Sequence, residues 1–282
     1  MPRLREFASV ASVAMMAMAA AIGVQRSGAV PRFASYLPVG EAIAQTPPPR
    51  VLQPPRFAHP IVRAAMLNSQ FAQAASDDVA DRIRAVVPRD LSGYFDLYLY
   101  VSKAAAGPWA QHMYVFHATD DGDLRFEQSF PVSTGREMQE KYFTSTPAGL
   151  FELDPDRFDR VHYSHRWHNA PMPWAMFLNY TINDRPTGVA LHSGIGHVAD
   201  LGHRASGGCV RMPPEKAEEL FERIQSTEAG RVPVFAMDGS TTDKTGRIAA
   251  DENGAPMFTQ GYRVLLIIED YPGAPVVVAT LS

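Results

Sequence analysis

The feature that most constrains the fold is a change of hydrophobic period after Leu91. From there the chain carries short runs rich in aromatic and β-branched residues, several of them alternating with polar positions, which is typical of strands. Such runs occur at residues 95–101, 113–117, 124–132, 150–153, 174–180, 188–192, 232–236 and 264–268. Asp121-Gly122 and Asn183-Asp184-Arg185-Pro186 are typical of turns between them. Many short strands with only one or two helices predict a mostly-β domain rather than a parallel α/β sheet.

One helix interrupts this series. Pro213 and Pro214 open it, Glu215 lies in its first turn, and four apolar residues share one face, namely Ala217, Leu220, Phe221 and Ile224. The predicted fold class is therefore mostly β (α+β), with one or two packed helices.

The chain has a single cysteine, Cys209, among 282 residues. This count excludes an intramolecular disulfide framework and any zinc or iron–sulfur site that needs several cysteines. The formal net charge of −4 offers no polybasic surface, so we expect no nucleic-acid partner. No glycine-rich phosphate loop of standard spacing is present, and no cofactor is predicted.

The N-terminus, residues 1–29, has the pattern of an export signal. Arg3 and Arg5 precede an uncharged apolar run at residues 7–24, and Ser27-Gly28-Ala29 supplies small residues for cleavage. The run approaches the roughly 20 residues that span a bilayer, so an uncleaved membrane anchor through residues 7–24 stays open. Either outcome predicts a periplasmic protein.

Residues 30–59 form a proline-rich segment, predicted to be an extended linker. Residues 60–90 are predicted to be helical: a first helix at 61–75 and a second in which Ser76 is the N-cap and Pro88 marks the end. The catalytic domain is placed at residues 91–240, and residues 241–282 are expected to be a C-terminal β extension packed on it.

The chemistry-bearing residues gather in one stretch of the chain. His192 ends a predicted strand, and Cys209 follows a loop that closes with Ser206-Gly207-Gly208. A thiol of pKa about 8.5 is a weak nucleophile until a nearby imidazole takes its proton. The paired glycines allow a tight turn whose N–H groups can face a developing oxyanion. Arg211 could hold a substrate carboxylate.

These residues resemble the signature of the L,D-transpeptidases, the YkuD-type catalytic domain. The resemblance rests on His192-Ser193-Gly194, on Ser206-Gly207-Gly208-Cys209-Val210-Arg211, and on two upstream elements, Ser133-Thr134-Gly135 and Thr146-Pro147-Ala148-Gly149. It implies a β-sandwich or barrel over roughly residues 91–236. One position departs from the family pattern, because most members carry histidine where this chain has Gly207.

The resemblance also implies a peptidoglycan enzyme. Cys209 would attack an L,D peptide bond of a donor stem peptide to form a thioester, with His192 as the base. Ser193 would orient the imidazole, and the N–H groups of Gly208 and Cys209 would bind the oxyanion. Arg211 and Ser206 are assigned to substrate binding, and His203 and Gly207 to possible loop contacts. The amine of an acceptor stem would then resolve the thioester into a cross-link, and carbapenem-type inhibitors are expected to acylate Cys209.

Several alternatives stay open. His203 could replace His192 as the base. Three imidazoles could also hold zinc, namely those of His192, His197 and His203. Their spacing matches no single helix face and lacks the His-Glu-x-x-His pattern, so no metal site is predicted. Residues 162–168 are predicted to be an exposed polar loop, with a cleft-lining lid as the alternative. Asp154, Asp156 and Asp159 are interpreted as a solvated turn.

The activity itself also has rivals. The same thiol site could hydrolyse stems as an L,D-carboxypeptidase or endopeptidase, or attach an outer-membrane protein to the wall. From another functional class, the domain could be a non-catalytic peptidoglycan-binding module.

Overall fold

The computed structural model describes residues 50–52, 75–274 and 276–278. Two mixed sheets form the framework. The five-stranded sheet has the order β4-β3-β2-β16-β5, with bounds Leu124–Pro131, His112–Ala118, Leu97–Ser102, Val264–Glu269 and Gly149–Phe151. The four-stranded sheet has the order β11-β10-β7-β6, with bounds Val210–Met212, Ala190–Ser193, Ala170–Leu178 and Leu153–Ser164. The mostly-β prediction is confirmed.

The five-stranded sheet is buried on both faces at its centre, where β2 and β16 pair in parallel. Leu97, Leu99 and Val101 of β2 face the core shared with the four-stranded sheet. Tyr98 and Tyr100 face the other side, beneath the helix at residues 75–86. Burial of both faces explains why residues 264–268 form an unbroken apolar run rather than an alternating one.

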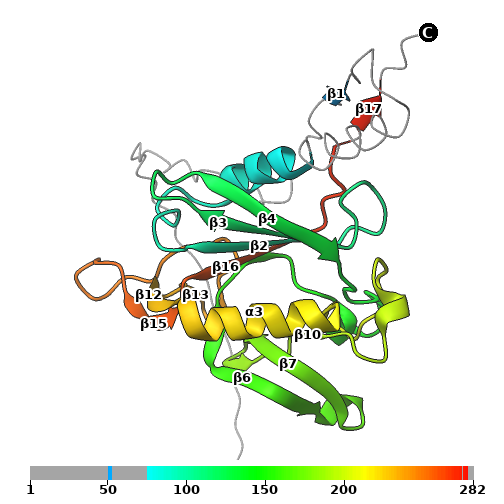
Figure 1. The fold of residues 1–282 in the computed structure, drawn as a ribbon. Helices are drawn as coiled ribbons and strands as arrows, with labels where there is room; N and C mark the ends of the chain where they lie inside the picture. The colour runs from blue at the N-terminus through cyan, green and yellow to red at the C-terminus, as the bar shows by residue number, and fades with distance from the viewer. Residues whose placement is uncertain (1–49, 53–74, 275, 279–282) are drawn as a thin grey trace, which may run out of the picture. The chain divides into compact units, whose positions relative to one another are not determined.

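Helix α3 (Pro214–Thr227) lies between the two sheets (Figure 1). The apolar face predicted from its 3.6-residue period, from Ala217 to Ile224, is fully buried in the core that both sheets share. Phe221 contacts Phe158 of β6 and Trp174 of β7, with ring centroids 5.5 Å and 5.3 Å away. The helix thus fixes the four-stranded sheet that carries the candidate site.

Shorter elements complete the described chain. Two-stranded ladders join β1 to β17, β8 to β9, β12 to β15 and β13 to β14. Their bounds are Arg50–Leu52, Val276–Val278, Thr181–Ile182, Arg185–Pro186, Ala229–Pro233, Phe258–Tyr262, Met237–Asp238 and Thr241–Thr242. Three 3₁₀ turns span Tyr142–Thr144, His165–Trp167 and Val198–Asp200.

The N-terminal expectations fall largely outside the described residues. This holds for the export signal at 1–29, for all of the linker except β1, and for the first predicted helix at 61–75 except its last residue. The second helix covers residues 75–86, so Ser76 lies inside it and is not its N-cap. Among the described residues, no helix has both the length and the apolar character needed to cross a membrane.

Strand β6 was not predicted. Residues 162–164 and all three aspartates of the expected turn belong to it, and only residues 165–168 remain in the turn that follows. Its sequence hides the strand because Asp154-Pro155-Asp156 disfavours a ladder and the register shifts between Leu153 and Phe158. One of its faces is also solvated, which leaves few apolar positions to alternate.

The segment predicted as a C-terminal extension supplies a strand to the main sheet. β16 pairs with β2 on one side and with β5 on the other. A boundary at residue 240 therefore does not separate two layers, because Leu265 and Leu266 lie in the same sheet as Tyr98 and Leu99.

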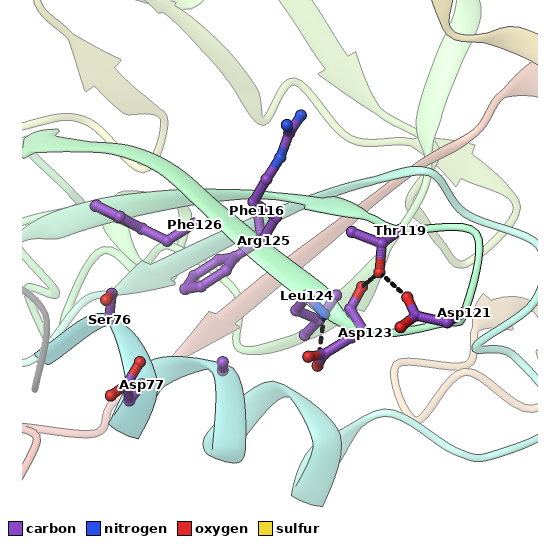
Figure 2. Close-up of a pocket in the computed structure, with 10 residues that line it drawn as sticks. Ser76, Asp77, Phe116, Thr119, Asp121, Asp123, Leu124, Arg125 and Phe126 are labelled. Atoms are coloured by element: carbon purple, nitrogen blue, oxygen red, sulfur yellow. Dashed lines mark hydrogen bonds between the residues drawn. The ribbon is translucent and has the colours of Figure 1, made fainter.

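A cavity of about 450 Å³ lies between the helix at residues 75–86 and the β3–β4 turn. Figure 2 shows the Thr119 hydroxyl donating to Asp121, and the Leu124 N–H donating to Asp123. Both hydrogen bonds join residues within the β3–β4 turn, which the sequence predicts from Asp121-Gly122. Among the described residues that line this cavity there is no cysteine or histidine.

Glu152 gives the fold a testable pH dependence. Its side chain is buried, its Oε1 has no partner among the described residues, and burial raises its pKa from 4.5 to about 8. Between these values the folded state binds more protons than the unfolded state, so stability falls as pH rises. We expect wild type to lose about 1.4 kcal/mol of unfolding free energy per pH unit between pH 5 and 7 through this group, and Glu152→Gln to lose none of it.

Urea unfolding of both proteins at pH 5 and 7 measures this difference directly. Glu218→Gln, an exposed position on α3, serves as the control for removing one carboxylate. Equal pH slopes in wild type and Glu152→Gln would contradict the assignment.

Candidate active site

The site is built on the parallel pairing of β10 and β11. Leu191 lies opposite Val210, and His192 lies opposite Arg211. Because side chains alternate along a strand, Leu191, Val210 and Met212 enter the core, which leaves His192 and Arg211 on the other face. Cys209 immediately precedes β11, and the backbone N–H of Ala190 contacts its thiol. The predicted base therefore lies on β10, and the predicted nucleophile immediately precedes the strand that pairs with β10.

The loop before Cys209 is held by hydrogen bonds from the upstream motif elements. Thr146 Oγ1 donates to the Gly208 carbonyl at 2.8 Å and accepts from the Gly135 N–H at 2.8 Å. The Ser206 hydroxyl donates to the Cys209 carbonyl at 2.5 Å. Gly208 has φ +117°, and a Cβ there would lie 2.7 Å from the Phe143 carbonyl oxygen, so this position requires glycine.

His192 is a buried, neutral imidazole. Its Nδ1 lies 2.9 Å from the Ser193 carbonyl, which can only accept, so Nδ1 carries the proton and Nε2 keeps its lone pair. Burial, helped by the Arg211 charge, lowers the pKa of His192 from 6.5 to about 4. At neutral pH the ring is thus able to take a proton.

Cys209 lies between polar main chain and an apolar wall. Its Sγ is 3.5 Å from the Gly188 carbonyl oxygen, and the residue packs against a small cluster made of Met172, Ala175, Phe177 and Ala190. Burial raises the pKa of the thiol, against the opposing effects of the Ala190 N–H and of Arg211. At neutral pH the resting site therefore holds a protonated thiol and a neutral imidazole rather than a thiolate–imidazolium pair.

Cys209, Gly207 and Gly208 line a cavity of about 850 Å³. The β6–β7 hairpin supplies part of its wall, including Arg166, Trp167 and Met172, and the chain around β8 and β9 supplies another part. Three cations line the cavity, namely Arg166, Arg185 and Lys244, and none of its described lining residues is acidic. The cavity thus has room and positive charge for an anionic ligand beside the thiol.

Residues 98–278 match the model of the YkuD family, the L,D-transpeptidase catalytic domain. The chain belongs to this family. The match covers the two sheets and reaches β17, further than the range of the sequence resemblance. A comparison with curated protein sequences found no match.

Solved structures of two L,D-transpeptidases and of a cell shape determining protein are similar to this chain at low identity. LdtMt1 in complex with imipenem is 16% identical, with a TM-score of 0.37 over 62% of this chain and 59% of that one. An Enterococcus faecium L,D-transpeptidase C442S mutant is 15% identical, with a TM-score of 0.31 over 62% and 50%. The helical cell shape determining protein Pgp2 from Campylobacter jejuni is 14% identical, with a TM-score of 0.34 over 63% and 49%. The match thus covers less than two thirds of each of these chains.

Two residues of the YkuD motif have contacts within the cysteine loop. The Ser206 side chain, which the resemblance assigns to the site, is fully buried and donates to the Cys209 carbonyl, so it supports the loop. The Gly208 N–H, which is expected to face the oxyanion, donates to Ser206 Oγ at 3.1 Å.

The remaining predicted residues lie around the loop. Arg211 is 17% exposed and forms an ion pair with Asp200 at 3.4 Å. Gly207 lines the cavity, whereas His203 is an exposed loop residue outside its lining. In the described part of the chain, no three His, Cys, Asp or Glu residues are grouped to hold a metal ion, so His192, His197 and His203 do not converge.

The sequence reasoning missed most of the cavity wall. Arg166, Arg185 and Lys244 carry no motif, and they meet only because three separate segments fold around the cysteine loop. Trp167 belongs to residues 162–168, for which a cleft-lining lid is the alternative prediction. Trp167 does line the cavity, whereas the neighbouring His165 and His168 are exposed.

Proposed function

We propose that this protein is an exported, periplasm-facing peptidoglycan L,D-transpeptidase. The observation that carries the proposal is the thiol of Cys209 at the wall of a cavity of about 850 Å³. Cys209 immediately precedes β11, which pairs with the strand that carries the buried neutral imidazole of His192. Export is supported by Arg3, Arg5 and the uncharged run at residues 7–24.

In the proposed reaction, Cys209 Sγ adds to the carbonyl of an L,D peptide bond as its proton passes to His192 Nε2. The Ala190 N–H supports the developing thiolate. We assign the oxyanion to the Cys209 N–H, because the Gly208 N–H is already bonded to Ser206. Collapse breaks the C–N bond, His192 returns the proton to the leaving amine, and a thioester remains.

The second half-reaction transfers the acyl group. The free amine of an acceptor stem attacks the thioester, loses its extra proton to His192, and displaces the Cys209 thiolate, which is reprotonated. The product is an amide cross-link, and the enzyme returns to its thiol form. No metal or organic cofactor is needed for this sequence of steps.

The charge of the cavity supports a stem peptide as the donor. Stem peptides bear carboxylates, and Arg166, Arg185 and Lys244 line the cavity without an acidic neighbour in that lining. Guanidinium and ammonium groups facing a shared cavity are suited to bind carboxylates.

Mass spectrometry of muropeptides, after incubation of the full chain with tetrapeptide stems, tests the proposal. New dimers from wild type and none from Cys209→Ala would support transpeptidation, and fragmentation would identify the linkage as 3,3 or 1,3. Shortened monomers without dimers would move the assignment to an L,D-carboxypeptidase. Unchanged stems without any acyl adduct would favour a binding module. A labelled outer-membrane protein as acceptor would reveal wall attachment.

A further inference from the structure

Gly207 stands where most family members carry histidine, and the structure gives a physical reason. A Cβ at position 207 would lie 2.5 Å from Cζ2 and 2.6 Å from Cε2 of Trp167. Real side chains do not approach so closely, and the atoms in the way belong to a rigid indole rather than to a flexible chain end. The Trp167 ring therefore occupies the room that a side chain at residue 207 would need.

The indole is held there from two sides. Trp167 lies at the tip of the β6–β7 hairpin, where His168 and Asn169 adopt left-handed conformations and the Asn169 N–H closes the turn on Ser164 at 2.9 Å. Its ring lies 6.0 Å from the Phe143 ring, and the Arg136 guanidinium lies 5.7 Å from its centroid.

A second contact joins the tip of the β6–β7 hairpin to the segment around Phe143. The Arg166 guanidinium lies 4.9 Å from the Phe143 ring. The tip is thus fastened to the segment that also contacts the cysteine loop at Gly208.

We propose that Trp167 and Gly207 are a matched pair in which the indole covers the cysteine loop and keeps water from the thioester. The inference rests on the proposed function. It assigns Trp167 as a positioning residue that favours the acceptor amine over water as the nucleophile that attacks the thioester. The indole fills this space and has no basic group that could take a proton from water. An imidazole at position 207 would place such a basic group there.

The step at issue is hydrolysis of the acyl-enzyme. Water oxygen adds to the thioester carbonyl, the C–S bond breaks, and the proton of the water restores the thiol while the acyl group leaves as a carboxylic acid. Exclusion of water by a packed apolar ring slows this step and leaves attack by a bound amine unaffected.

The test measures the lifetime of the imipenem adduct on Cys209 by intact-protein mass spectrometry, using the full chain. We expect Trp167→Ala to shorten the adduct lifetime about tenfold or more, and Trp167→Phe to shorten it less than about threefold. Tyr163→Ala is the matched control, because Tyr163 is an aromatic residue of the same hairpin, is 56% exposed and lies outside the cavity lining. Its adduct should last as long as that of wild type.

A double-variant cycle tests the pairing itself. Gly207→His alone should slow adduct formation about tenfold, because indole and imidazole cannot both be accommodated, and Gly207→His with Trp167→Ala should restore the rate to within about threefold of wild type. An unchanged lifetime in Trp167→Ala, or the absence of rescue in the double variant, would overturn the inference while leaving the proposed function in place. No adduct on wild type would overturn the proposed function, and this inference with it.

Discussion

A Cys209→Ser variant is expected to lose acylation and cross-linking by about 10³-fold or more while it keeps its fold. The reason lies in the base. Burial lowers the pKa of His192 to about 4, so its imidazole is a weak base. It can assist a thiol, whose ordinary pKa is about 8.5, but not an alcohol, which is a far weaker acid.

Intact-protein mass spectrometry with imipenem and muropeptide analysis check this loss together. Cys209 is the only cysteine, so the variant retains no thiol that could react elsewhere on the chain. Thermal unfolding is the control for folding, and a change within about 1 kcal/mol is expected because the substitution removes no bulk from the two main cores. Dimers or adducts from the serine variant at wild-type rates would contradict the assigned nucleophile.

Most of the fold was predictable wherever burial leaves a clear period in the sequence. β2 and β16 are buried on both faces, and α3 is buried along one face. The pattern of their apolar residues therefore identifies each element as a strand or a helix. β6 was missed because half of the hairpin is solvated and a proline lies at its register shift. Its partner β7 begins at Ala170, four residues before the predicted strand, for the same reason.

The candidate site was predictable only where it is local in the sequence. Cys209, His192 and the two upstream elements form motifs whose order and spacing can be recognised, and the structure adds that Thr146 bonds to the cysteine loop. The cavity wall is not local. Trp167 contacts Gly207, which is forty residues later in the sequence, and Lys244 follows α3 in the sequence. Contacts of that range depend on the sheet pairing, which no single segment encodes.

Replacement of His192 by glutamine is expected to lower kcat/KM for acylation about 10²- to 10⁴-fold at pH 7, the usual contribution of a general base. Glutamine keeps the approximate size of the side chain but cannot take the thiol proton. The distinctive result is a change in the pH profile. Wild type needs a neutral imidazole, so its rate should be flat from pH 8 to about 5 and should fall as pH drops through about 4.

The glutamine variant should behave differently across the same range. Without a base, reaction depends on the small fraction of thiolate, and burial raises the pKa of Cys209 above the whole range. Its rate should therefore rise about tenfold per pH unit. Intact-protein mass spectrometry of imipenem acylation, with samples quenched at timed intervals at pH 4 to 8, gives the pH–rate profiles of wild type and of the glutamine variant. A glutamine variant with the flat wild-type profile would show that another group, such as His203, is the base.

Stability provides an independent check on the same imidazole. The folded pKa of about 4 lies below the unfolded value of 6.5, so the unfolded state binds more protons between these pH values. Wild type should therefore lose about 3 kcal/mol of unfolding free energy through this group as pH falls from 6.5 to 4, and the glutamine variant should not. Because this loss could imitate the acid limb of the rate profile, urea unfolding at each pH separates the two effects. An acid limb that persists where the folded fraction is unchanged identifies titration of the base itself.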